Sequence, residues 1–227
     1  MISGLDETKL QQWIETSLQN NSNTLAEGYQ GKTLLYKDNS QNFVIKTPHG
    51  KGLLKYIHTL MLRHEHRIYK ELTDFSGAPK CYGLIDNKYL VIEYINGQPI
   101  RNKRPDDDQA YFSKLLELIE QMHRLNVAHM DLKKKDNLLI TENDQPCLID
   151  FGAAVIKKKG FHPFNTFWYK LAKRFDYNAW IKHKYHNKMN NISNVDRAHY
   201  KQTLTEKYAG LIKKTYAKIK SLKNTHS

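Results

Sequence analysis

Cysteine is scarce in this chain of 227 residues, which contains only Cys81 and Cys147. Residues 1–20 include acidic side chains and no continuous apolar stretch, so they lack the pattern of a signal peptide. Two thiols without an export signal argue against a disulfide framework and indicate a reducing compartment. We therefore expect a cytoplasmic protein.

Long apolar runs are also missing. No stretch approaches the roughly 18 to 20 apolar residues that a membrane-spanning helix needs, so we expect no transmembrane segment. Hydrophobic residues nevertheless make up 40% of the chain and aromatic residues 11%. This composition supports a packed core and argues against global disorder, and the length suits one large domain or two small lobes.

Acidic residues are rare in the C-terminal third. Residues 153–227 contain 17 Lys and Arg but only three acids, a local charge of +14 in a chain whose net charge is +13. One interpretation is a set of helices with solvated lysine faces. The other is a surface that contacts an anionic partner, such as anionic lipid, lipopolysaccharide or an acidic protein, with the chain bound peripherally at the inner membrane surface. Nucleic acid is the least favoured partner, because only the basic charge points to it.

The hydrophobic patterning changes near residue 95. Before it, strands dominate, with hairpins expected over 33–47 and 84–94. After it, helices dominate, apart from a short hairpin over 137–150. We expect helices over 5–19, 53–72, 106–125, 164–186 and 195–222. The pattern predicts an α+β fold with two lobes, residues 1–95 (an N-terminal helix, an antiparallel sheet and one inserted helix) and residues 96–227.

The stretch AEGYQGKT, residues 26–33, nearly matches the phosphate-binding P-loop, with Ala26 in place of the first glycine. A P-loop joins a buried strand to a helix that starts at its Gly-Lys pair. Here the preceding residues are polar and the following ones have strand character. We therefore favour a hairpin tipped by Gly28 and Gly31, with Lys32 as a flanking residue.

The densest chemical signal spans residues 129–152. It resembles the catalytic motifs of the protein-kinase-like superfamily, H-R-D-L-x-x-x-N followed by D-F-G. The matching residues are His129, Met130, Asp131, Leu132 and Asn137, then Asp150, Phe151 and Gly152. Either motif alone is common, but the ordered pair around an apolar hairpin is rarely met by chance. The resemblance implies a bilobal kinase-like fold.

The resemblance also implies roles for these side chains. Asp131 would orient the acceptor hydroxyl and take its proton, and Lys133 would neutralise the transferred phosphate. Asn137 and Asp150 would hold two Mg²⁺ ions through hard oxygen ligands. Five residues instead of four separate Asp131 from Asn137, so we place the extra residue in the lysine run. Asp136 remains the alternative metal ligand.

Upstream segments resemble the nucleotide-binding half of the same superfamily. Lys46 in NFVIKT is similar to the V-A-I-K lysine that holds the phosphates of ATP. Its expected partner is Glu65; Glu71 is the weaker candidate, because six residues place it on the other side of a helix. The backbones of Glu93 and Ile95 would meet adenine.

The remaining elements depart from the superfamily pattern. Gly28 and Gly31 resemble a degenerate form of the loop that covers the phosphates, which normally has three glycines. Met130 replaces the Arg that meets a phosphorylated activation loop, so we expect that switch to be absent. No A-P-E motif follows Gly152. The resulting expectation is a reduced, helical C-lobe, as in RIO-type kinases, bacterial lipopolysaccharide-core sugar kinases and small bacterial serine/threonine kinases.

These observations predict an ATP- and Mg²⁺-dependent kinase. The favoured acceptor is a serine or threonine of a protein, including the chain itself. A sugar hydroxyl on an anionic glycolipid, the lipopolysaccharide core, is the alternative acceptor. A pseudokinase that binds nucleotide without transferring phosphate is the alternative from a different class.

Overall fold

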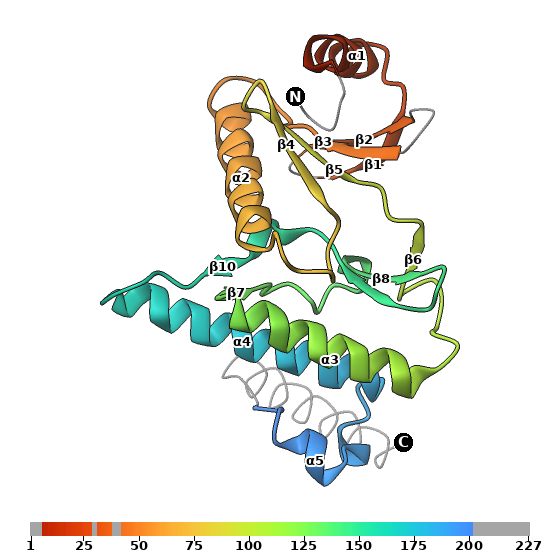
Figure 1. The fold of residues 1–227 in the computed structure, drawn as a ribbon, viewed down its shortest axis with the longest axis vertical. Helices are drawn as coiled ribbons and strands as arrows, with labels where there is room; N and C mark the ends of the chain where they lie inside the picture. Colours follow the sequence, from red (N-terminus) through yellow and green to blue (C-terminus); the bar gives the residue numbers. More distant parts are fainter. Residues whose placement is uncertain (1–5, 29–30, 38–41, 202–227) are drawn as a thin grey trace, which may run out of the picture.

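The computed structural model describes residues 6–28, 31–37 and 42–201 of the chain. The chain folds into two lobes, an upper one built on a sheet and a lower one built on helices (Figure 1). The α+β, bilobal expectation is thereby confirmed, whereas the boundary at residues 95 and 96 stays a prediction. Among the described residues, no helix has the length and apolar character needed to cross a bilayer.

A five-stranded antiparallel sheet forms the upper lobe, in the order β1-β2-β3-β5-β4. Its strands are β1 (Thr24–Glu27), β2 (Lys32–Lys37), β3 (Asn42–Lys46), β4 (Cys81–Ile85) and β5 (Tyr89–Glu93). Two helices accompany the sheet, α1 (Glu7–Gln19) and α2 (Gly52–Glu71). The carboxylate of Asp6 caps α1 by accepting hydrogen bonds from the next turn.

The alternation of side chains along β3 divides the core of the upper lobe. Phe43 and Ile45 pack in one apolar cluster with Leu10 and Ile14 of α1, and Val44 belongs to the cluster that includes Leu62 of α2. Successive side chains of a strand point to opposite faces, so one strand buries both of its faces. The functional consequence is that Lys46, the next residue on the Val44 face, points to the α2 side of the sheet.

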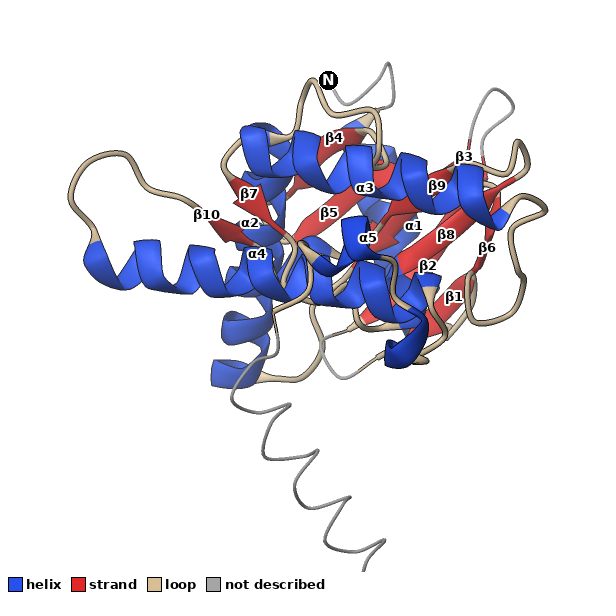
Figure 2. Cartoon of the chain, turned by 90° about the horizontal axis from the view of Figure 1, so that it is seen from below, coloured by secondary structure: helices blue, strands red, loops and turns tan. Residues whose placement is uncertain are grey.

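The lower lobe consists of helices with two small sheets above them. The helices are α3 (Asp108–Arg124), α4 (Pro163–Lys184) and α5 (Asn194–Arg197), with short 3₁₀ turns η1 (Lys135–Asn137), η2 (Phe151–Ala153) and η3 (Met189–Asn191). One sheet contains β6 (Gly97–Pro99), β8 (Leu138–Thr141) and β9 (Pro146–Leu148), and the other pairs β7 (Val127–Ala128) with β10 (Val155–Ile156). Helices α3 and α4 lie side by side (Figures 1 and 2), and the Trp180 indole donates to the Phe112 carbonyl at 2.7 Å.

Four of the five expected helices are present within two residues of their predicted ends, and the three expected hairpins form. The expected helix over 195–222 is different. Helix α5 ends at Arg197, and residues 198–201 are not helical; the remainder of that segment lies outside the described residues. Its short length follows from Ser193, which caps a four-residue helix, and from the buried Asp196, which contacts Tyr185 and Lys184 rather than a further turn.

The glycine pair at the start of the sheet belongs to a hairpin. The amide of Gly28 donates to the Gly31 carbonyl at 2.9 Å, and the amide of Gly31 donates back at 3.3 Å. Strand β1 precedes the pair and strand β2 begins at Lys32, so no helix starts there. The P-loop interpretation is therefore wrong and the hairpin interpretation is right.

Candidate active site

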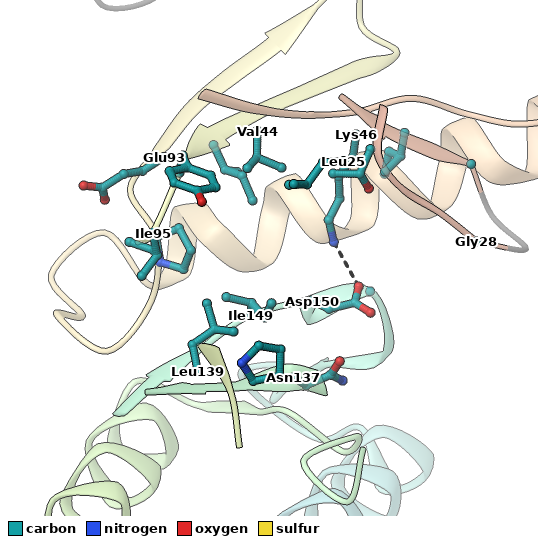
Figure 3. Close-up of a pocket in the computed structure, with 18 of the residues that line it drawn as sticks. Leu25, Gly28, Val44, Lys46, Glu93, Ile95, Asn137, Leu139, Ile149 and Asp150 are labelled. Atoms are coloured by element: carbon teal, nitrogen blue, oxygen red, sulfur yellow. Dashed lines mark hydrogen bonds and ion pairs between the residues drawn. The ribbon is translucent and has the colours of Figure 1, made fainter. Parts of the chain in front are cut away.

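A cavity of about 600 Å³ lies between the two lobes. Its upper wall comes from β1, β2, β3 and β5, and its lower wall from β8 and the segment around Asp150 (Figure 3). Among the predicted site residues, eight line this cavity: Gly28, Gly31, Lys46, Glu93, Ile95, Asp131, Asn137 and Asp150. The structure thus brings together residues that the sequence scatters over more than half of its length.

Lys46 is the centre of this arrangement. Its Nζ lies 2.7 Å from Oε1 of Glu65 on α2 and 2.9 Å from Oδ1 of Asp150, a residue 104 positions away. Glu65 is almost fully buried and does not line the cavity, so its carboxylate acts on Lys46 from behind. Glu71, the weaker candidate, is exposed near the end of α2 and lines a different hollow.

The charges of this triad support one another. Burial lowers the pKa of Lys46, but the carboxylates of Glu65 and Asp150 outweigh it and raise that pKa to about 12. Burial would raise the pKa of Asp150, and the Lys46 ammonium, with smaller contributions from Lys134 and His129, lowers it instead. Lys46 and Asp150 are therefore both charged at neutral pH, ready to contact phosphate and cation respectively.

Backbone strain helps to aim Asp150 into the cavity. Asp150 has φ 65° and ψ 68°, in the left-handed region that residues with a side chain rarely adopt. Phe151, the next residue, is buried and packs its ring against Tyr69 at 5.2 Å and His129 at 4.7 Å. His129 also donates from Nε2 to the Ile149 carbonyl at 3.0 Å. It is thus a packing residue behind the Asp-Phe-Gly turn, as the sequence predicted.

Asn137 and Asp131 are joined directly. Nδ2 of Asn137 donates to the Asp131 carboxylate at 3.2 Å and to the Asp131 carbonyl at 3.1 Å. The amide nitrogen is thereby committed, which leaves the amide oxygen of Asn137 as the atom available to a cation. Asp136 does not line the cavity and pairs with Arg101 at 2.9 Å. The geometry favours Asn137 over Asp136 as the metal ligand.

The lysine run of the loop separates by exposure and direction. Lys134 lines the cavity, and its Nζ lies 3.8 Å from Oδ2 of Asp150. Lys133, the residue that the resemblance selected, is exposed and is not among the cavity-lining residues. The extra residue between Asp131 and Asn137 therefore moves the cavity-facing lysine by one position.

Gly31 is required by packing as well as by the hairpin. A Cβ built on Gly31 would lie 1.6 Å from the Thr47 carbonyl oxygen, an impossible approach. Gly28, at the other side of the turn, has its nearest neighbour at 3.9 Å. Only one of the two glycines is therefore dictated by close backbone contact.

Asp176 of α4 is the functional residue that the sequence interpretation missed. It is fully buried, and its carboxylate accepts hydrogen bonds from the amides of His129 and Met130, at 2.9 and 2.8 Å, and from Nε2 of His123 at 2.9 Å. It fixes the backbone just before Asp131, where Met130 has a left-handed φ of 69°. The available signal was a single acid in the otherwise basic and aromatic helix 164–186.

Comparison with known proteins agrees with this geometry. The family model described as the protein kinase domain matches residues 20–208. The chain belongs to the protein kinase family. The atypical branch suggested by the short C-lobe is compatible with this match.

Individual relatives are serine/threonine kinases by name. The chain is 36% identical over 102 residues to a probable serine/threonine-protein kinase KIN1 homolog of Encephalitozoon cuniculi, covering 40% of this chain and 16% of the relative. It is 25% identical over 162 residues to casein kinase II subunit alpha' of Saccharomyces cerevisiae, covering 66% and 44%. It is 33% identical over 84 residues to serine/threonine-protein kinase D of Synechocystis sp., covering 34% and 17%. The matches span less than half the length of each of these relatives.

Proposed function

We propose that this protein transfers the γ-phosphoryl group of ATP, with Mg²⁺, to the hydroxyl of a serine or threonine in a protein, itself included. The observation that carries the proposal is the contact of Lys46 with both Glu65 and Asp150, at the edge of a cavity that also holds Asn137 and Asp131. These groups are the ones that phosphoryl transfer requires, because its catalysis rests on positioning and on charge neutralisation.

The cavity suits ATP in size and in polarity. Its volume of about 600 Å³ lies within the usual range of small-molecule sites. Apolar side chains from both lobes, Leu25, Val44, Leu139 and Ile149, face each other across one part of the cavity (Figure 3). This part suits a flat base, with the backbones of Glu93 and Ile95 meeting its edge.

The residues present also suit Mg²⁺. The Asp150 carboxylate and the Asn137 amide oxygen are hard ligands, and Mg²⁺ takes only one or two protein ligands when phosphate oxygens and waters complete its shell. No group of three or more metal-ligating His, Cys, Asp or Glu side chains is present in the described residues, which agrees with a cation that arrives with the nucleotide. When bound, Mg²⁺ would neutralise charge on the phosphates.

The side chains then have distinct tasks. Lys46 holds the phosphates, and Glu65 fixes its ammonium from the buried side. Asp131, held at Oδ2 by Asn137, orients the acceptor hydroxyl and takes its proton at Oδ1, which accepts no hydrogen bond from the described residues. Lys134 faces the same cavity and would neutralise the transferred group; the sequence prediction gave this task to Lys133.

The acceptor is the least determined part of the proposal. A protein hydroxyl agrees with the names of the relatives, and it comes first for that reason. Residues 153–162 alone connect the Asp-Phe-Gly turn to α4, which leaves little chain for a peptide-docking platform. This short connection keeps the sugar hydroxyl of an anionic glycolipid as the second acceptor. The charged triad argues against a pseudokinase.

The proposal is tested by incubating the full chain with γ-labelled ATP and Mg²⁺ in three reactions: alone, with a casein-like protein, and with purified lipopolysaccharide core. Label on serine or threonine that is lost in Asp150→Ala supports a protein kinase. Label confined to the glycolipid selects the second acceptor. Mg²⁺-dependent nucleotide binding without label in any reaction contradicts the proposal and supports the pseudokinase.

A further inference from the structure

The loop after β10 and the first turns of α4, residues 157–170, form a projection that we call the aromatic tip. Figures 1 and 2 both show the loop and the start of α4 extending beyond the rest of the lower lobe. A hollow of about 670 Å³ lies behind the loop, with Glu71 and Asn126 on its far side. The tip is therefore a convex feature held away from the body.

Four large aromatic side chains of the tip are exposed. Their exposed fractions are 91% for Phe161, 84% for Phe164, 62% for Phe167 and 48% for Trp168. Phe164, Phe167 and Trp168 have the i, i+3, i+4 spacing that places side chains on one face of a helix. An apolar patch of this density on a projecting element is typical of an interaction surface.

Lysines surround these aromatic residues. Lys157, Lys158, Lys159 and Lys170 are exposed, and none of them forms an ion pair with another residue in the part of the chain that the structure describes. The sequence has no acid between residues 153 and 175, and Asp176 is buried in the catalytic-loop anchor. The tip is thus both apolar and cationic, with its cations unneutralised.

We propose that the aromatic tip docks onto an anionic phospholipid bilayer. Phenylalanine and tryptophan side chains insert at the boundary between headgroups and acyl chains, and lysines beside them gain from the negative surface potential. A convex tip suits a flat, deformable surface better than a folded partner, which needs a complementary face. The surface is independent of phosphoryl transfer, although Lys157 follows Asp150 closely in the chain and docking would hold the active site near the membrane.

Sedimentation of the full chain with vesicles tests the proposal. We expect binding to vesicles of phosphatidylcholine mixed with phosphatidylglycerol, weaker binding at high salt, and little binding to phosphatidylcholine alone. Replacing Lys157, Lys158 and Lys159 by Gln should lower the partition coefficient roughly 100-fold, because each lysine near an anionic surface contributes about fivefold. Phe161→Ser with Phe164→Ser should lower it about tenfold or more.

Matched controls remove the same groups elsewhere. Replacing Lys188, Arg197 and Lys201 by Gln removes the same charge from the C-terminal third, at and before α5, and should change the partition coefficient less than about threefold. Leu53→Ser with Ile57→Ser removes two exposed apolar side chains of α2, with 74% and 44% exposed, and should leave binding unchanged. Circular dichroism of each variant checks that it folds.

Tryptophan fluorescence gives a readout that does not depend on these variants. The chain has three tryptophans, of which Trp180 is buried and Trp168 lies on the tip. Brominated lipid in anionic vesicles should quench the wild-type emission, and Trp168→Phe should remove the quenched component. Membrane binding that persists in the lysine variant, binding equal on neutral vesicles, or quenching that survives Trp168→Phe would each overturn the proposal. So would a tip that binds random duplex DNA but not anionic vesicles.

Discussion

The two sides of this protein contrast in how tightly their residues are held. On the nucleotide side, Lys46, Glu65 and Asp150 come from three distant segments and are fixed by contacts of 2.7 and 2.9 Å. On the acceptor side, the short connection over residues 153–162 leads directly into a helix whose first turns expose aromatic residues. The difference indicates that phosphoryl transfer demands an exact internal geometry, whereas the choice of acceptor depends on surfaces that vary.

Asp176 connects the two sides. It belongs to α4, which begins at the aromatic tip, yet its carboxylate holds the amides of His129 and Met130 just before Asp131. The reduced lower lobe therefore keeps the one helix whose carboxylate supports the catalytic loop. The comparison can be tested residue by residue, from the largest expected effect to the smallest.

The largest effect is expected from Asp131→Ala. Turnover should fall by about 10³-fold, because the acceptor hydroxyl loses its base, while ATP affinity should hardly change. Asp136→Ala is the matched control: its half-exposed pair with Arg101 lies outside the cavity, and turnover should stay within about twofold. Phosphate-transfer kinetics and equilibrium nucleotide binding measure the two quantities. Joint loss of binding and stability in Asp131→Ala would assign Asp131 a structural role.

Asp176→Ala tests whether the acceptor side supports the nucleotide side. Removing a buried carboxylate that accepts three hydrogen bonds should lower the free energy of unfolding by about 3 kcal/mol or more and should reduce turnover. Asp108→Ala, which breaks an exposed pair with Arg104, should cost less than about 1 kcal/mol. Chemical denaturation gives both values. Equal costs for the two variants would mean that the buried anchor is unimportant.

Lys134→Ala and Lys133→Ala form a pair that separates neighbours in one loop. Lys134 faces the cavity near Asp150, so its loss should reduce turnover by about 10²-fold, as for other groups that stabilise transition-state charge. Lys133 is exposed, and its loss should change turnover less than about twofold. Steady-state kinetics decide between them. A larger effect at Lys133 would restore the assignment made from the sequence pattern.

The two glycines of the hairpin should respond differently to alanine. Gly31→Ala forces a Cβ against the Thr47 carbonyl, so the hairpin must shift and nucleotide affinity should fall by about tenfold. Gly28→Ala meets its nearest neighbour at an ordinary 3.9 Å and should alter stability by no more than about 0.5 kcal/mol. Titration calorimetry and thermal melts measure these changes. Similar losses at both positions would show that flexibility, and not close packing, sets the glycine requirement.

The smallest effect concerns pH. The lowered pKa of Asp150 contributes stability that is lost only as pH falls through that lowered value, below the ordinary 3.8. The raised pKa of Lys46 contributes stability that is complete below 10.5 and is lost as pH rises through about 12. The stability difference between wild type and Lys46→Met should therefore be flat between about pH 5 and pH 9. Thermal melts across this range check it, and a slope near pH 7 would contradict the charged triad.

The sequence predicted the nucleotide side well because its signals are local. Lys46 ends a hydrophobic strand, Glu65 lies in a long helix, and Asp150 follows an apolar hairpin, so each was recognisable in its own segment. The glycine hairpin was likewise resolved by the residues that flank it.

The remaining features depend on contacts between distant segments. Asp176 is functional only because α4 packs beneath the catalytic loop, and the choice between Lys133 and Lys134 depends on the exact path of η1. The expected helix over 195–222 rested on periodicity alone, whereas the buried Asp196 and its partners end α5 early.

Equilibrium binding of a non-hydrolysable ATP analogue, with and without Mg²⁺, tests the central claim most directly. The account predicts Mg²⁺-dependent binding to the wild type, and a loss of at least about tenfold in Lys46→Met and in Asp150→Ala, because each removes a charge that faces the phosphates or the cation. Binding that is unchanged by both substitutions and by removal of Mg²⁺ would contradict the claim that these side chains converge on one nucleotide.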